Sequence, residues 1–106
     1  MKWVEIITLR SPTSINKKFV DELLKEVGES DSPTDTLKRL LEIKTYYHFV
    51  VETDLSIHIY WDSEAGNQHK SPLGLRIFSA LRSMGLLNNS VWIERASREI
   101  SHRPGK

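Results

Sequence analysis

The stretch LSIHIYW, residues 55–61, is the part of the sequence that decides the predicted fold. Apolar and polar side chains alternate along it, and a period of two is typical of a strand with one buried face. The apolar set that should face the core is Leu55, Ile57, Ile59 and Trp61. The polar set that should face the other way is Ser56, His58 and Tyr60.

A second strand is predicted just upstream, over YYHFVVE, residues 46–52. Only Thr53 and Asp54 separate the two strands, so they should form an antiparallel hairpin. If the hairpin loop holds three residues, His48 and Glu52 share a face with His58. If it holds two, they lie on the opposite face, because a slip of one residue exchanges the two faces of a strand.

Strands are also predicted at the two ends of the chain. One covers residues 2–10 (KWVEIITLR), and the other lies in residues 88–97 (NNSVWIERAS), which open with an Asn-Asn-Ser turn at 88–90. A helix is predicted over residues 14–28, with Ser14 as its cap and Gly28 at its end. Another should run from the Ser71 cap to Gly85. A short extra helix is expected over residues 33–43, following a capping-box pattern that starts at Ser32.

Without the short helix, the order of elements is βαββαβ, the ferredoxin-like arrangement of the α+β class. It predicts a four-stranded antiparallel sheet with both long helices on one face and the other face open. The 106 residues fit one domain, expected over 1–97, with a basic flexible tail over 98–106.

Composition excludes several classes of function. The formal net charge is only +1, which gives no electrostatic argument for binding nucleic acid. The chain has no cysteine, so disulfides, thiolate metal sites and a cysteine nucleophile are excluded. No apolar run is long enough to cross a membrane, and no signal peptide is visible, so we expect a cytoplasmic protein that uses no membrane.

The open sheet face is where a function is expected, because exposed aromatic area usually marks an interaction site. His58, Tyr60 and His69 are the candidate catalytic residues, since histidine and tyrosine can exchange protons. Trp61 and Trp92 are candidates for stacking a flat ligand, although we favour a role in filling the core or a subunit interface for both. His48 is a further ligand-binding candidate. It has no evident third partner for a metal, and no metal site is predicted.

The segment HIYWDSEAGNQHKSPLGLRIFSAL, residues 58–81, resembles the dimeric α+β barrel proteins, and among them the antibiotic biosynthesis monooxygenase-like group. The shared pattern is a strand ending in an aromatic residue, here Trp61, then a short acidic and small-residue stretch. A helix follows that is entered near a histidine and a small-residue–proline pair, here His69 and Ser71-Pro72. The segments 46–54 and 91–96 match the preceding and closing strands.

The resemblance implies a homodimer in which two open sheet faces press together into a barrel around a pocket. It implies a cofactor-independent monooxygenase-like enzyme that acts on a small aromatic substrate, in which His58, Tyr60 or His69 helps to form an enolate that reacts with oxygen. The alternative is a non-catalytic ligand-binding or protein-interaction module of the same fold. A regulatory domain of the ACT kind shares the topology, whereas the aromatic motif of an RNA-binding sheet is missing.

Overall fold

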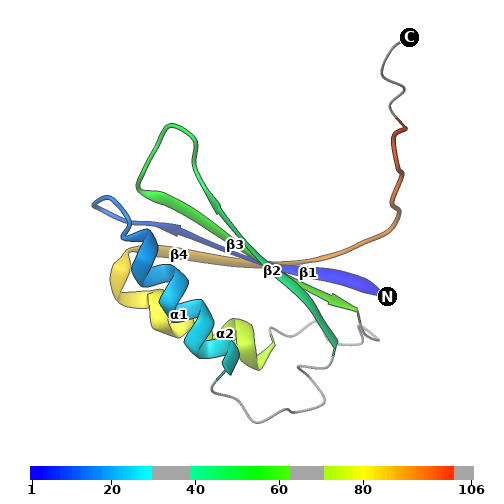
Figure 1. Ribbon diagram of the computed structural model, residues 1–106, viewed down its shortest axis with the longest axis horizontal. Helices are drawn as coiled ribbons and strands as arrows, with labels where there is room; N and C mark the ends of the chain where they lie inside the picture. The colour runs from blue at the N-terminus through cyan, green and yellow to red at the C-terminus, as the bar shows by residue number, and fades with distance from the viewer. Residues whose placement is uncertain (30–38, 63–70, 102–106) are drawn as a thin grey trace.

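A computed structural model of the chain describes residues 1–29, 39–62 and 71–101 (Figure 1). The elements follow the order β1 (Lys2–Arg10), α1 (Lys17–Glu29), β2 (Leu40–Tyr47), β3 (Asp54–Asp62), α2 (Pro72–Leu81), the short 3-10 helix η2 (Arg82–Met84) and β4 (Leu86–Ile93). The predicted βαββαβ order is therefore confirmed.

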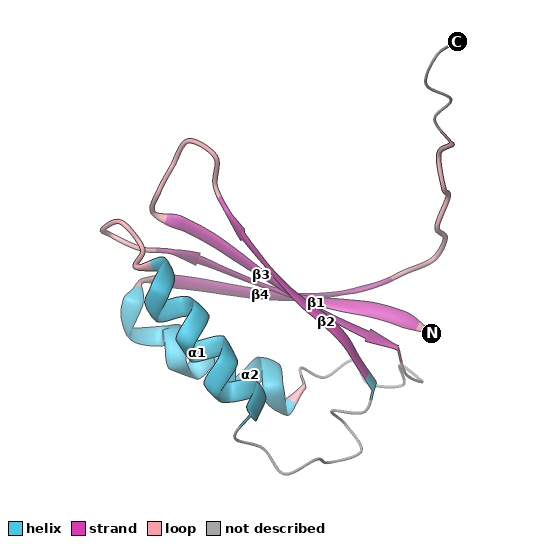
Figure 2. Cartoon of the chain, in the orientation of Figure 1, coloured by secondary structure: helices cyan, strands magenta, loops and turns pink. Residues whose placement is uncertain are grey.

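The four strands form one antiparallel sheet in the order β2-β3-β1-β4. Both helices cover the same face of this sheet, and the opposite face is open within the described part of the chain (Figure 2). The ferredoxin-like fold predicted from the sequence is thus correct. None of the described helices combines the length and the apolar character that crossing a membrane requires.

The core lies between the sheet and the two helices. The alternation in β3 holds as predicted, because Leu55, Ile57, Ile59 and Trp61 are all at most 2% exposed. Pairing with β1 places a second row of apolar side chains beside them, and α2 packs a third set of apolar side chains against this face of the sheet. These further core residues include Ile7, Leu9, Leu73, Ile77 and Leu81.

Three predicted boundaries are wrong, and the first concerns β2. This strand covers residues 40–47 rather than 46–52, and residues 48–53 form the hairpin loop, which is longer than either alternative considered. Residues 40–43, assigned to the extra helix, instead begin β2, because Ile43, Thr45 and Tyr47 alternate with polar residues as a strand requires. The earlier part of the predicted helix, residues 33–38, lies outside the described residues.

The other two corrections concern a helix and the last strand. Asn16, not Ser14, caps α1, because its Oδ1 accepts a hydrogen bond from the Phe19 N–H at 3.1 Å. The helix also runs past Gly28. Residues 88–90, predicted as a turn, lie inside β4, which already begins at Leu86. By contrast, Ser71 caps α2 as predicted, with Pro72 at its start.

Candidate functional site

The open face of the sheet is built from three rows of side chains that run across the strands in the order β2, β3, β1, β4. The first row is Tyr46, Ser56, Thr8 and Asn88. The second row is Lys44, His58, Ile6 and Ser90. The third row is Glu42, Tyr60, Val4 and Trp92. His58 therefore lies in the middle row, on one of the two central strands.

His58 is held between two hydroxyl groups of its own strand. Its Nε2 lies 2.8 Å from the Ser56 Oγ, and its Nδ1 lies 3.4 Å from the Tyr60 hydroxyl. Residues two apart on a strand point to the same face, which is why these three side chains meet. The Tyr46 ring packs against the imidazole with 4.6 Å between ring centroids. Predicted site residues His58 and Tyr60 are thus brought together.

The edge strand β2 supplies charge to this group. The Lys44 Nζ lies 5.5 Å from the centroid of the Tyr60 ring and 3.8 Å from a carboxylate oxygen of Glu42. Glu42 and Lys44 were not among the sequence candidates, because the predicted strand began too late. The signal was present in LEIKTYY, where Glu42, Lys44 and Tyr46 alternate with residues that face the helices.

The surroundings shift the protonation of both central groups. Burial lowers the pKa of His58, and the positive charge of Lys44 lowers it further. Burial is the main cause that raises the pKa of Tyr60. Its hydrogen bond to Tyr46 and the negative charge of Glu42 raise this pKa further. At neutral pH the imidazole is therefore neutral and the phenol protonated. A neutral imidazole in this position can accept a proton.

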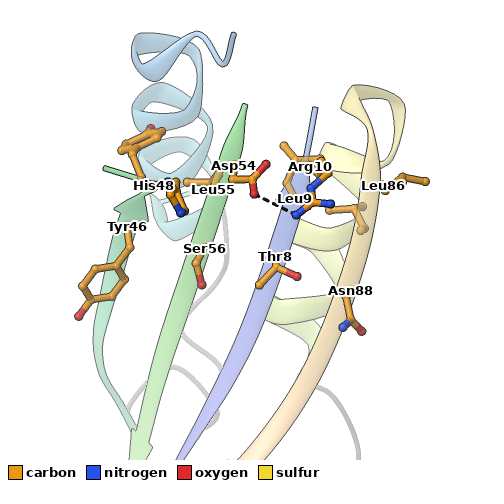
Figure 3. A pocket seen from close by; sticks show the side chains of 12 residues that line it. Thr8, Leu9, Arg10, Tyr46, His48, Asp54, Leu55, Ser56, Leu86 and Asn88 are labelled. Carbon is orange, nitrogen blue, oxygen red and sulfur yellow. Dashed lines mark hydrogen bonds and ion pairs between the residues drawn. The ribbon is translucent and has the colours of Figure 1, made fainter. Parts of the chain in front are cut away.

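A hollow of about 590 Å³ opens next to this group, at the end of the sheet that carries the hairpin loop. Figure 3 shows that the first row of the open face, with one polar side chain from each strand, lies along it. Ser56 belongs both to this lining and to the His58 contact, so it connects the hollow to the imidazole. An ion pair between Arg10 and Asp54, 3.3 Å apart, lies at the rim.

A smaller hollow of about 160 Å³ lies at the other end of the same face. Tyr60 and Trp92 border it, together with Leu41 of the bulged start of β2. Trp92 is 60% exposed, and its indole N–H donates to the Ser90 Oγ at 2.9 Å. The predicted ligand-binding residue Trp92 is therefore on the open face, two strands away from His58.

Two other predicted site residues lie elsewhere. Trp61 is 1% exposed on the helix face, where its ring stacks on Trp3 with centroids 5.6 Å apart. Its indole therefore belongs to the core rather than to the group around His58. His48 lies in the hairpin loop at the rim of the large hollow, not on β2, and Glu52 is in the same loop. His69 lies outside the described residues.

Among the described residues, no group of three His, Asp or Glu side chains is placed to hold a metal ion. The His58 imidazole is accompanied by three hydroxyls, one ammonium and one carboxylate. This set can bind and orient an oxygen-bearing ligand and can exchange a proton with it.

No protein-family model matches this sequence, and no curated protein is significantly similar to it. Solved structures do match. SnoaB, a cofactor-independent oxygenase from Streptomyces nogalater, superimposes with a TM-score of 0.62 at 8% identity over 91% of this chain and 95% of its own. A Deinococcus radiodurans protein provisionally assigned as an antibiotic biosynthesis monooxygenase gives 0.62 at 16% identity, over 94% and 99% of the two chains.

A third structure, from Mycobacterium tuberculosis, gives a TM-score of 0.59 at 10% identity over 93% of this chain and all of its own. At these identities the likeness concerns the fold. The predicted resemblance to the antibiotic biosynthesis monooxygenase-like group is confirmed at that level: this chain has the ferredoxin-like α+β fold of those structures.

Proposed function

We propose that this chain is a cofactor-independent oxygenase-like enzyme that acts, as a homodimeric barrel, on a small aromatic substrate. The observation that carries the proposal is the neutral His58, held between Ser56 and Tyr60 beside a hollow of about 590 Å³. That volume falls in the range of sites for small molecules. The likeness in fold to SnoaB, described as a cofactor-independent oxygenase, supports the same class of reaction.

The substrate we infer has an acidic CH2 group conjugated with a ketone through an aromatic ring, so that loss of one proton gives a stabilised enolate. The ring system would lie in the large hollow, and the hydroxyls of Tyr46, Ser56 and Thr8 would bind its oxygen atoms. His58 would take the proton, either directly or through the Ser56 hydroxyl 2.8 Å away. The Tyr60 contact to Nδ1 would keep the imidazole in one orientation.

Molecular oxygen is the co-reactant in this proposal. The enolate carbon transfers electrons to oxygen and forms a C–O bond, which gives a peroxide anion. The protonated His58 returns its proton, and a hydroperoxide results. Loss of the remaining C–H proton, with breakage of the O–O bond, then gives a ketone and one water. The balance is CH2 + O2 → C=O + H2O, in which four electrons leave the carbon and reduce the oxygen.

The open face would be covered by a second copy of the chain. Val4 and Ile6 are only half-buried on this face, and Trp92 and Leu86 are exposed on it. An open sheet face with aromatic and aliphatic side chains is unfavourable in water and usually marks an interface. Covering it would also exclude bulk water from the group around His58.

The test is oxygen uptake with anthrone, a three-ring ketone that carries such a CH2 group, together with detection of anthraquinone. We expect His58→Asn to lower kcat by about a hundredfold or more, the usual contribution of a general base. Ser56→Ala should lower it less, and Ser79→Ala, on the exposed surface of α2, should leave it unchanged.

Two results would count against the proposal, the first against the activity and the second against the role of His58. Wild-type protein that binds anthrone without consuming oxygen would favour the alternative, a ligand-binding module. Full activity in His58→Asn would show that His58 is not the base.

A further inference from the structure

The loop between β2 and β3 presents an apolar tip. Phe49 is 97% exposed and Val50 is 77% exposed. Figure 1 shows that this hairpin rises on the side of the sheet away from the helices, so the tip stands beside the open face. Large apolar side chains exposed to this degree at the end of a loop are costly in water unless another surface covers them.

The tip is held in a defined shape. The His48 Nδ1 accepts hydrogen bonds from the backbone N–H groups of Val50, at 3.1 Å, and Val51, at 2.9 Å. The loop is also tied to the segment after β1, because Ser11 N–H donates to the Thr53 carbonyl at 2.9 Å. Phe49 is therefore presented by an ordered turn, which reduces the entropy that would be lost on docking.

The smaller hollow on the open face is a suitable receptor for one aromatic ring. Its volume is about 160 Å³, and the exposed side chains of Leu41 and Trp92 lie along it. An apolar cavity of about 150 Å³ is known to hold a benzene molecule. The hollow therefore fits the ring of a phenylalanine.

The chain cannot fill this hollow with its own Phe49. The hollow lies where Leu40 pairs with Trp61, at the start of β2, and the hairpin loop lies beyond the Tyr47–Leu55 pair at its end. Seven residues of strand separate the two ends, which corresponds to roughly 23 Å at about 3.3 Å per residue. Only a second molecule can bring a Phe49 ring to this position.

We propose that Phe49 of one copy inserts into the hollow bordered by the side chains of Leu41, Tyr60 and Trp92 of a second copy. This inference rests on the homodimer of the proposed function and adds the residue by which the partner closes the site. The tip and the hollow lie on the same open side of one chain. A two-fold dimer would therefore make the contact twice, as a closed symmetric interface requires.

In such a dimer the two hollows would have different roles. The partner's Phe49 would plug the end of the open face near Trp92. The larger hollow at the opposite end would remain available to a ligand, enclosed by the second sheet. Because the two-fold makes both ends of the barrel equivalent, each end would hold one inserted Phe49 ring and one large hollow.

The absence of cysteine from the chain makes cross-linking a clean test. In the double variant Phe49→Cys/Leu41→Cys the two thiols of one chain are too far apart to bridge, because a disulfide needs Cα atoms within about 7 Å. Mild oxidation should therefore give a covalent dimer on a non-reducing gel. The matched control is Phe49→Cys/Leu75→Cys, since Leu75 on α2 is as exposed as Leu41, 51% against 52%.

A second variant tests the contact without cross-linking. Phe49→Ser should weaken the dimer about tenfold or more by sedimentation, as expected for a buried aromatic anchor. The tip is exposed in the single chain, so this variant should keep its fold. Leu75→Ser is the control. Trp92 is the exposed tryptophan, so a red shift of its fluorescence should accompany dissociation.

The outcomes separate this inference from the proposed function. A wild-type dimer that Phe49→Ser leaves intact, with no 41–49 disulfide, would overturn the inference and leave the homodimer standing. A monomeric wild type would overturn both the homodimer and the contact. A 41–49 disulfide in a protein that consumes no oxygen with anthrone would support the contact and count against the enzyme.

Discussion

Glu5 and Trp61 are joined across the two central strands by a hydrogen bond of 2.8 Å, from the indole Nε1 to the carboxylate Oε1. Glu5 is fully buried on the helix face of the sheet. Its other oxygen accepts the backbone N–H of Ser71 at 3.0 Å, at the start of α2. One buried carboxylate therefore ties β1, β3 and the beginning of α2 together, where the positive end of the helix dipole favours a negative charge.

We predict that Glu5→Gln lowers the free energy of unfolding by about 1–3 kcal/mol. The amide has one accepting oxygen, whereas both carboxylate oxygens accept from N–H groups. The variant would place an NH2 group against one of these two donors and leave it unsatisfied. Urea unfolding followed by circular dichroism measures the change.

The control is Glu26→Gln on the exposed surface of α1. A surface change of this kind should alter the free energy of unfolding by less than about 0.5 kcal/mol. Equal stability of Glu5→Gln and wild type would mean that the carboxylate is dispensable for holding α2 to the sheet.

A second prediction concerns Gly74 in the first turns of α2. An alanine in a helix is normally more stable than a glycine by up to about 1 kcal/mol. Here a Cβ at position 74 would clash with the Glu5 Oε2 and lie 3.2 Å from the Ser71 Oγ. Because both atoms are buried and hydrogen-bonded, we expect Gly74→Ala to destabilise the protein instead.

A double-mutant cycle with Glu5→Ala identifies the cause, because removing the carboxylate removes the clash. In that background Gly74→Ala should cost clearly less, with a coupling of about 0.5–3 kcal/mol. Additive effects of the two substitutions would show that the glycine is required for some reason other than Glu5.

Much of the fold was predictable, because the strongest signals are local. The alternation in residues 55–61 fixed which residues of β3 face the core, and the Ser71-Pro72 pair marked the start of α2. The bounds of β2 were not predictable with the same ease. Residues 46–52 are rich in aromatic and β-branched types, yet they continue into an exposed loop tip with Phe49 and Val50. Local strand propensity was overridden there by pairing with β3.

The candidate site was predictable only in part. His58 and Tyr60 followed from the alternation of their own strand, whereas Lys44 and Tyr46 depend on the register between β2 and β3. Register is a property of two strands, and here it is fixed by a loop whose length the pattern did not reveal. The burial of Glu5 had no local sequence signal, because its partners lie 56 and 66 residues away.

A third prediction concerns the hairpin loop. His48→Phe removes the acceptor of two backbone N–H groups, so amide hydrogen exchange at residues 50 and 51 should become faster, by about tenfold or more if one net hydrogen bond of about 1–1.5 kcal/mol is lost. His48→Asn offers a side-chain oxygen to the same groups and should restore part of the protection. Unchanged exchange in His48→Phe would mean that the imidazole does not organise the tip.

The last prediction concerns the pH at which His58 titrates. Burial and the charge of Lys44 both lower the pKa of His58, so Lys44→Gln should raise it. The value should stay below that of an ordinary histidine, because burial remains in the variant. Nuclear magnetic resonance titration of the imidazole C–H signals measures the shift directly, and Lys25→Gln on α1 serves as a charge-matched control that should leave it in place.

The sign of the effect on activity follows from the role proposed for His58. A base acts only when deprotonated, so the acidic limb of the rate profile should fall as pH drops through the pKa of His58. Lys44→Gln should therefore move that limb toward higher pH by the same amount as the titration. The same low folded-state pKa means that His58 supports folding above the ordinary histidine pKa and that this contribution is lost as pH falls. A limb that stays in place while the titration moves would assign the acidic limb to another group.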